Sequence, residues 1–96
     1  MEKNAGYEIR ESVLFDNGRG FALGENDRAS APFVTWQFAE ENGHRDYFWG
    51  HYHTEEAAAV KDFAARSADY QRRYGVQEVK LPIAEQMKAA KEQTEK

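Results

Sequence analysis

The sequence predicts a two-layer α+β fold in which one main helix covers a four-stranded antiparallel meander sheet, followed by a short C-terminal helix. Three observations predict this fold. Apolar and polar residues alternate with the period of a strand from Tyr7 to Phe15. Aromatic and β-branched residues flank an Asn42-Gly43 turn signal. An Ala-rich amphipathic stretch then runs from Thr54 to Tyr74, as expected of a helix that packs on the sheet.

The composition is that of a single globular domain over residues 1–96, with residues 1–6 and 92–96 expected to fray. The chain has 96 residues, of which 41% are hydrophobic and 31% charged. It has no apolar run long enough to cross a bilayer and no apolar signal segment at its start, so we expect a cytoplasmic protein without membrane contact. The chain contains no Cys, which excludes thiolate catalysis and Cys-based zinc sites.

The first hairpin is predicted from Tyr7 to Gly24. The strand from Tyr7 to Phe15 should turn at Asn17-Gly18, where a type I′ turn needs positive φ at both residues, and return from Gly20 to Gly24. In this register Asp16 faces Arg19 across the turn. A loop from Glu25 to Pro32 then leads to the next strand.

The second hairpin is predicted to pair strand 33–39 with strand 45–52 around a two-residue turn at Asn42-Gly43. This register places the two Trp residues opposite each other. One face carries Trp36 with Trp49, Phe38 with Tyr47 and Val34 with His51, and the other carries Phe33 with Tyr52, Thr35 with Gly50 and Gln37 with Phe48. A slip of one residue would exchange the faces of one strand, so the register is a specific prediction.

Thr54 is predicted to cap a helix that ends near Tyr74, and Gly75 is the expected left-handed residue after it. The stripe predicted to face the sheet is Ala59, Val60, Phe63, Ser67, Tyr70 and Tyr74, and charged residues, Asp62 and Arg66 among them, take the remaining circumference. An extended edge segment is predicted over 76–81, and a second helix over 82–91.

No feature of the sequence predicts catalysis, a cofactor or a metal. His51 and His53 lie on the same side of a strand, a spacing from which two ligands can reach one metal, but no third His lies at a recognisable motif distance. Packing of both imidazoles is the simpler interpretation. The nearest carboxylate pairs lie in a turn or an exposed helical turn, which rarely desolvates an acid. We therefore expect a protein that is not an enzyme.

The feature that predicts binding is the aromatic second hairpin, which has more aromatic surface than one helix can cover. Its candidate binding residues are Phe33, Phe48, Tyr52, Trp36, Trp49, Tyr47 and Arg45. This surface can pack intramolecularly, meet a protein partner or a second copy of the chain, or stack the bases of a single strand. The formal net charge of −4 disfavours nucleic acid and favours docking on a basic protein surface.

Residues 6–74 contain a recognisable pattern of aromatic strands followed by a helix. It consists of Tyr7-Glu8-Ile9 at the start, the run from Val34 to Gln37, the run from Asp46 to Tyr52, and the Ala-rich helix ending near Tyr70. In this pattern the chain resembles small uncharacterised accessory proteins carried by integrative and conjugative elements of gut-dwelling Gram-positive bacteria. The resemblance implies an accessory role in mobile DNA, where small acidic proteins include inhibitors of host nucleases such as anti-CRISPR proteins. It assigns no functional residue.

The leading hypothesis from the sequence is therefore a non-enzymatic protein-interaction module that inhibits a host nucleic-acid or defence factor. The alternative is a weak single-stranded nucleic-acid binder that uses the same aromatic surface.

Overall fold

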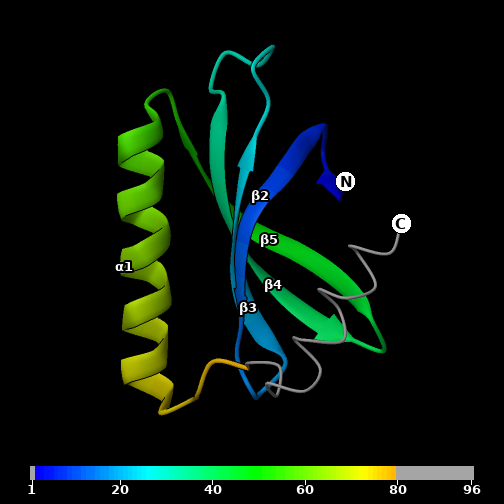
Figure 1. Ribbon diagram of the computed structural model, residues 1–96, viewed down its shortest axis with the longest axis vertical. Coiled ribbons are helices and arrows are strands. Elements are labelled where there is room, and N and C mark those ends of the chain that lie inside the picture. Colours follow the sequence, from blue (N-terminus) through cyan, green and yellow to red (C-terminus); the bar gives the residue numbers. More distant parts are fainter. Residues whose placement is uncertain (1, 80–96) are drawn as a thin grey trace, which may run out of the picture.

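A computed structural model describes residues 2–79 as a curled antiparallel sheet with one helix packed on one face (Figure 1). The strands follow one another across the sheet in chain order. The elements are β1 (Lys3–Asn4), β2 (Tyr7–Leu14), β3 (Arg19–Glu25), β4 (Phe33–Glu41), β5 (His44–His53) and α1 (Glu56–Tyr74). The predicted α+β class is confirmed, but the meander has five strands rather than four. The predicted helix over 82–91 lies outside the described residues.

The additional strand, β1, lies in the N-terminal segment that was expected to fray. It pairs with the start of β2 through Lys3 with Glu8 and Asn4 with Tyr7. At the other end of β2, residues 76–79 lie along the same edge, and the backbone N–H of Val79 donates to the carbonyl of Leu14 at 2.7 Å. The extended segment predicted after the main helix is therefore confirmed as far as Val79.

The turn between β2 and β3 differs from the predicted type I′ turn. Gly18 has positive φ, but Asn17 does not. The N–H of Gly18 donates to the carbonyl of Phe15 at 3.0 Å, and the N–H of Phe15 donates to the carbonyl of Arg19 at 2.8 Å. These bonds define a type I turn followed by a glycine bulge. The prediction that Asp16 faces Arg19 is wrong, because Phe15 takes that place.

The hairpin of β4 and β5 turns at Asn42 and Gly43, whose φ values of 54° and 79° confirm the predicted type I′ turn. The register predicted next to the turn is also confirmed, with Phe38 opposite Tyr47 and Gln37 opposite Phe48. Further along, Thr35 pairs with His51, Val34 with Tyr52 and Phe33 with His53. The register has shifted by one residue, so the three pairs predicted for this part of the hairpin, Val34 with His51, Phe33 with Tyr52 and Thr35 with Gly50, are wrong.

A β-bulge causes the shift, because β5 places both Trp49 and Gly50 opposite Trp36. Trp49 has φ 54°, a left-handed conformation that bulky residues rarely adopt. Gly50 takes the place facing the buried indole, since a Cβ there would lie 2.9 Å from Nε1 of Trp36. The predicted pairing of the two Trp residues on one face is therefore wrong.

Helix α1 ends as predicted but begins differently. Gly75 has left-handed φ and ψ of 65° and 28°, and its N–H donates to the carbonyl of Gln71. At the other end the N-cap position falls on Glu55, which makes no capping hydrogen bond through its side chain. The predicted Thr54 cap is wrong, and the helix relies on packing against the sheet.

Both faces of the sheet contain buried apolar residues. On the helix side Phe15, Phe21 and Val76 form one cluster, against which Phe63 and Tyr70 of α1 pack. Tyr7, Val34 and Trp36 form the other cluster. Because side chains alternate along a strand, and Thr35 and Gln37 face α1, Val34 and Trp36 point away from the helix.

Candidate binding groove

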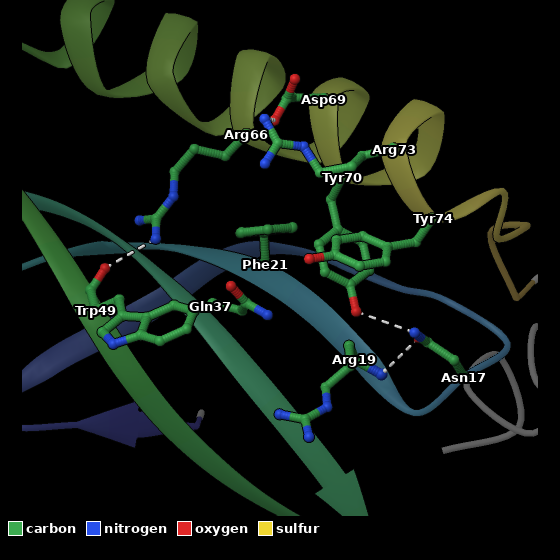
Figure 2. A pocket seen from close by; sticks show the side chains of 10 residues that line it. All are labelled: Asn17, Arg19, Phe21, Gln37, Trp49, Arg66, Asp69, Tyr70, Arg73 and Tyr74. Atoms are coloured by element: carbon green, nitrogen blue, oxygen red, sulfur yellow. Dashed lines mark hydrogen bonds and ion pairs between the residues drawn. The ribbon is translucent and has the colours of Figure 1, made fainter.

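An open groove of about 650 Å³ lies between α1 and the strands β3, β4 and β5, toward the C-terminal end of the helix (Figure 2). Each of these elements and the β2–β3 turn contribute side chains to it. The lining residues are Asn17, Arg19, Phe21, Gln37, Trp49, Arg66, Asp69, Tyr70, Arg73 and Tyr74. The groove therefore combines aromatic rings with guanidinium groups.

Trp49 forms one wall of the groove and, at 69%, is the most exposed large hydrophobic residue in the described part of the chain. The bulge turns its side chain toward the helix side of the sheet rather than toward Trp36. Its indole packs edge-on against Phe48, with ring centroids 5.0 Å apart. The carbonyl of Trp49 accepts a hydrogen bond from Arg66 at 2.9 Å, which ties the bulge to α1 (Figure 2).

Arg66 holds helix and sheet together at the groove. Its guanidinium also donates to the carbonyl and to the hydroxyl of Thr35, each at 3.0 Å, and lies 5.3 Å from the ring centroid of Phe21. Burial lowers the pKa of Arg66, while the charge of Asp62 opposes that effect. A guanidinium so bonded is pre-organised, and it keeps its positive charge beside the groove.

Two tyrosines of α1 form the wall that faces the β2–β3 turn. The Tyr70 ring stacks on Phe15 at 5.6 Å, and its hydroxyl accepts a hydrogen bond from the Asn17 amide at 3.0 Å (Figure 2). The Tyr74 ring lies 4.5 Å from Tyr70 and is 61% exposed. Tyr70 is therefore fixed, while Tyr74 offers its ring to solvent.

The charge of the groove is opposite in sign to that of the whole chain. Three arginines and one carboxylate line it, although the net charge of the protein is −4. Asp69 lies 2.9 Å from Arg72, outside the groove, and 3.6 Å from Arg73. Arg19 has no ion pair among residues 2–79. The groove is thus a local cationic site.

Next to the groove, a polar cluster joins the middle of α1 to the sheet. One carboxylate oxygen of Asp62 lies 2.6 Å from the Thr35 hydroxyl, 2.9 Å from Nδ1 of His51 and 3.2 Å from Nε2 of His53. Burial works to raise the pKa of Asp62, but these hydrogen bonds outweigh it and hold the pKa below its ordinary value. Within the described part of the chain, no group of three His, Asp or Glu residues has the geometry to hold a metal ion.

The structure divides the predicted aromatic surface between the two faces of the sheet. Trp49 lines the groove, and Phe48 packs beside it, partly buried. Trp36 is only 4% exposed and lies in the core on the other face. Tyr52 is 55% exposed but packs near Tyr7 on that same other face. The candidate residues therefore lie on two faces, as the predicted register has them, but Trp49 is separated from Trp36, and of the candidate residues Trp49 is the one that lines the groove.

Three other predicted residues have structural contacts instead. Phe33 is half-buried and pairs with His53 at the far end of the hairpin. The Arg45 guanidinium donates to Glu40 at 2.7 Å and lies 4.2 Å from the ring centroid of Phe38, so it is already engaged. Burial, together with the hydrogen bond to Glu2, raises the pKa of Tyr47 to about 12. These contacts make Arg45 and Tyr47 part of the fold.

Sequence reasoning missed most of the groove. The helical pattern predicts Arg66 on the solvent side of the helix, and Tyr70 and Tyr74 in its buried stripe. A usable signal was present, because Tyr70 and Tyr74 lie one turn apart at the helix end and Arg73 lies between them. Aromatic residues next to arginines at a helix end fit a binding surface as well as a core.

No family model, curated protein or solved structure matches this chain. Within residues 2–79, no helix combines the length and apolar character that crossing a bilayer requires.

Proposed function

We propose that the protein is a non-enzymatic module that binds a protein partner through the groove, with Trp49 as the main anchor. The observation that supports this most directly is the conformation of Trp49. The residue is 69% exposed although it is apolar, and it has φ 54° although it is bulky. Both properties cost stability. The strained backbone belongs to the bulge that makes room for the Trp36 indole, but that packing does not require a large apolar side chain at position 49.

The strain supports a binding role because the fold maintains it. A left-handed bulky residue costs about 1–2 kcal/mol, and such residues concentrate at binding sites. Arg66 holds the strained backbone in place through the carbonyl of Trp49. An exposed Trp held rigidly loses little entropy on binding, and Trp is among the residues that most often dominate interface energies.

The side chains of the groove are suited to binding rather than to reaction. Guanidinium, phenol, indole and amide groups predominate, and the Asp62 oxygen in the neighbouring cluster already contacts three donors. In line with the resemblance to accessory proteins of mobile elements, we place the partner among host factors of nucleic-acid metabolism or defence, in the cytoplasm. Inhibition would follow from occupying a functional surface of that factor.

Capture from a Gram-positive host lysate tests this function. The wild-type protein should retain a partner that the Trp49→Ala variant loses. Tyr52→Ala is the matched control, because Tyr52 is an exposed aromatic residue of the same strand on the other face. Equal capture by wild type and Trp49→Ala would reject the proposal.

Single-stranded nucleic acid is a second candidate, favoured by the groove's arginines beside exposed aromatic rings. Stacking on such rings contributes about 1–3 kcal/mol per base. Fluorescence anisotropy with a labelled oligo-dT separates the candidates. Nucleic-acid binding should weaken steeply between about 50 and 200 mM salt, in proportion to the phosphates contacted.

A further inference from the structure

Gln37 is a polar residue of the groove floor whose side-chain amide makes no hydrogen bond to another of the residues 2–79. It is 8% exposed, lies at the centre of β4 and lines the groove (Figure 2). Among the described residues, every side-chain polar atom that is fully buried has a hydrogen-bond partner. The Gln37 side chain takes part in none of the side-chain hydrogen bonds around the groove, so its polar atoms are not fully buried. Its amide therefore faces the space of the groove, where it can bond a ligand.

An amide offers one acceptor oxygen and a donor NH₂ group, so it matches both the N–H and the C=O of a peptide group. A phosphate oxygen or the ring oxygen of a deoxyribose would use the donor alone. The unused capacity of Gln37 therefore favours an extended peptide on the groove floor over a nucleic-acid backbone.

The charges on either side of Gln37 indicate what the peptide carries. Arg19 reaches the groove from the sheet and Arg73 from the helix. Arg19 has no ion pair among the described residues, and Arg73 lies 3.6 Å from Asp69, farther than Arg72 does at 2.9 Å. Guanidinium groups bind carboxylates through two parallel hydrogen bonds. Because the whole protein has a net charge of −4, a short acidic segment is accepted more readily than a long polyanion.

The rings supply the apolar part of the site. Trp49 and Tyr74 are exposed at 69% and 61%, and Phe21 is buried between the sheet and the helix. An apolar side chain that enters the groove would cover surface on these rings without disturbing the contacts that hold Tyr70.

We infer that the groove binds an extended acidic segment of a partner protein, in which a large apolar side chain is flanked by carboxylates. Gln37 bonds the backbone of the segment, Arg19 and Arg73 pair with its carboxylates, and Trp49 packs on its apolar side chain. This inference rests on the proposed function and specifies the chemistry of the partner.

The test uses two capped peptides, Ser-Glu-Leu-Glu-Ser and its neutral isostere Ser-Gln-Leu-Gln-Ser, titrated into the full-length ¹⁵N-labelled protein. The acidic peptide should shift the indole N–H of Trp49 and the side-chain amide of Gln37, with a Kd of about 1 mM or tighter. The isostere should bind about tenfold more weakly. Arg19→Ala and Arg73→Ala should each weaken the acidic peptide by a similar factor.

Lys61→Ala is the matched control, because Lys61 is an exposed cation of the same helix that neither lines the groove nor pairs with Asp69. It should leave peptide binding unchanged. The inference is overturned if the two peptides bind equally, if neither shifts Trp49 and Gln37, or if oligo-dT shifts them while the acidic peptide does not. Should lysate capture still depend on Trp49 in any of these cases, the proposed function stands and only the acidic chemistry of the partner is rejected.

Discussion

The hydroxyl of Thr35 donates to the carboxylate of Asp62 at 2.6 Å and so joins the centre of the sheet to the middle of α1. Thr35 is fully buried, and the same carboxylate oxygen also contacts His51 and His53. The contact between helix and sheet is therefore polar at this point and apolar around Phe63 and Tyr70. Hydrogen bonds hold the helix on the sheet at this point, whereas most helix–sheet contacts are held by a continuous apolar stripe.

We predict that Asp62→Ala lowers the free energy of unfolding by about 1–3 kcal/mol, because it removes the partner of a buried hydroxyl and of two imidazoles. Urea denaturation followed by circular dichroism measures the change. Asp69→Ala is the control on the same helix, since the Asp69 side chain is 50% exposed and its ion pairs are at the surface. That variant should stay within about 0.5 kcal/mol of wild type. Equal losses in both variants would show that the cluster contributes no special stability.

The same carboxylate predicts a dependence on pH. Because hydrogen bonds depress the pKa of Asp62 in the folded state, its contribution is fully present above the ordinary carboxyl pKa of about 4 and is lost as the pH falls through the lower folded value. The charged or titratable groups facing it are His51 and His53 on β5 and Arg66 on its own helix. The advantage of wild type over Asp62→Asn should therefore shrink as the pH falls below about 4. Urea midpoints at each pH measure it, and an advantage that grows with acidity contradicts the assignment.

The features predicted correctly from sequence are those fixed by local chemistry. Asn42-Gly43 satisfies the positive φ of a type I′ turn, and this turn alone sets the register of the adjacent pairs. Gly75 ends the helix for a similar reason. Neither feature depends on residues distant in sequence.

The bulge at Trp49 depends on a distant residue and was therefore missed. A regular ladder would place the Trp49 side chain against Trp36, whereas the bulge brings Gly50 there and leaves room for the buried indole. A glycine within a strand often marks a bulge, so Gly50 was a usable signal. The side that Trp49 then takes follows from the contact between Arg66 and its carbonyl, which no local pattern predicts.

Helical patterning separates polar from apolar residues and therefore predicts Asp62 and Arg66 on the solvent side of the helix. In the structure both side chains turn toward the sheet, where Thr35 offers a buried hydroxyl and carbonyl. The position of Thr35 on the helix side follows from the register of β4, so the polar contact could be predicted only after the sheet was known.

The two tryptophans should respond oppositely to substitution. Trp36→Ala should cost about 3–5 kcal/mol, because Trp36 is 4% exposed and packs against Tyr7 and Val34. Trp49→Gly should change the free energy of unfolding by no more than about 1 kcal/mol, because glycine relieves the left-handed strain while the lost indole was mostly exposed. Urea denaturation followed by circular dichroism avoids reliance on Trp fluorescence. A loss in Trp49→Gly as large as that in Trp36→Ala would place Trp49 in the core and remove the basis for its binding role.

Gly20 should tolerate substitution less well than any turn glycine. A Cβ at Gly20 would overlap the carbonyl oxygen of Val13 and the ring of Phe38, and the Val13 carbonyl belongs to the neighbouring strand and cannot move aside. We expect Gly20→Ala to cost about 3 kcal/mol or more, through separation of β2 from β3 and displacement of the fully buried Phe38 ring. Gly43→Ala is the matched comparison, because a Cβ there meets nothing within 4 Å and only its φ of +79° opposes the change. That variant should lose about 1 kcal/mol. Thermal denaturation of both variants ranks them, and a Gly20→Ala protein as stable as Gly43→Ala would mean that the close approach of β2 and Phe38 to Gly20 is not a requirement of the fold.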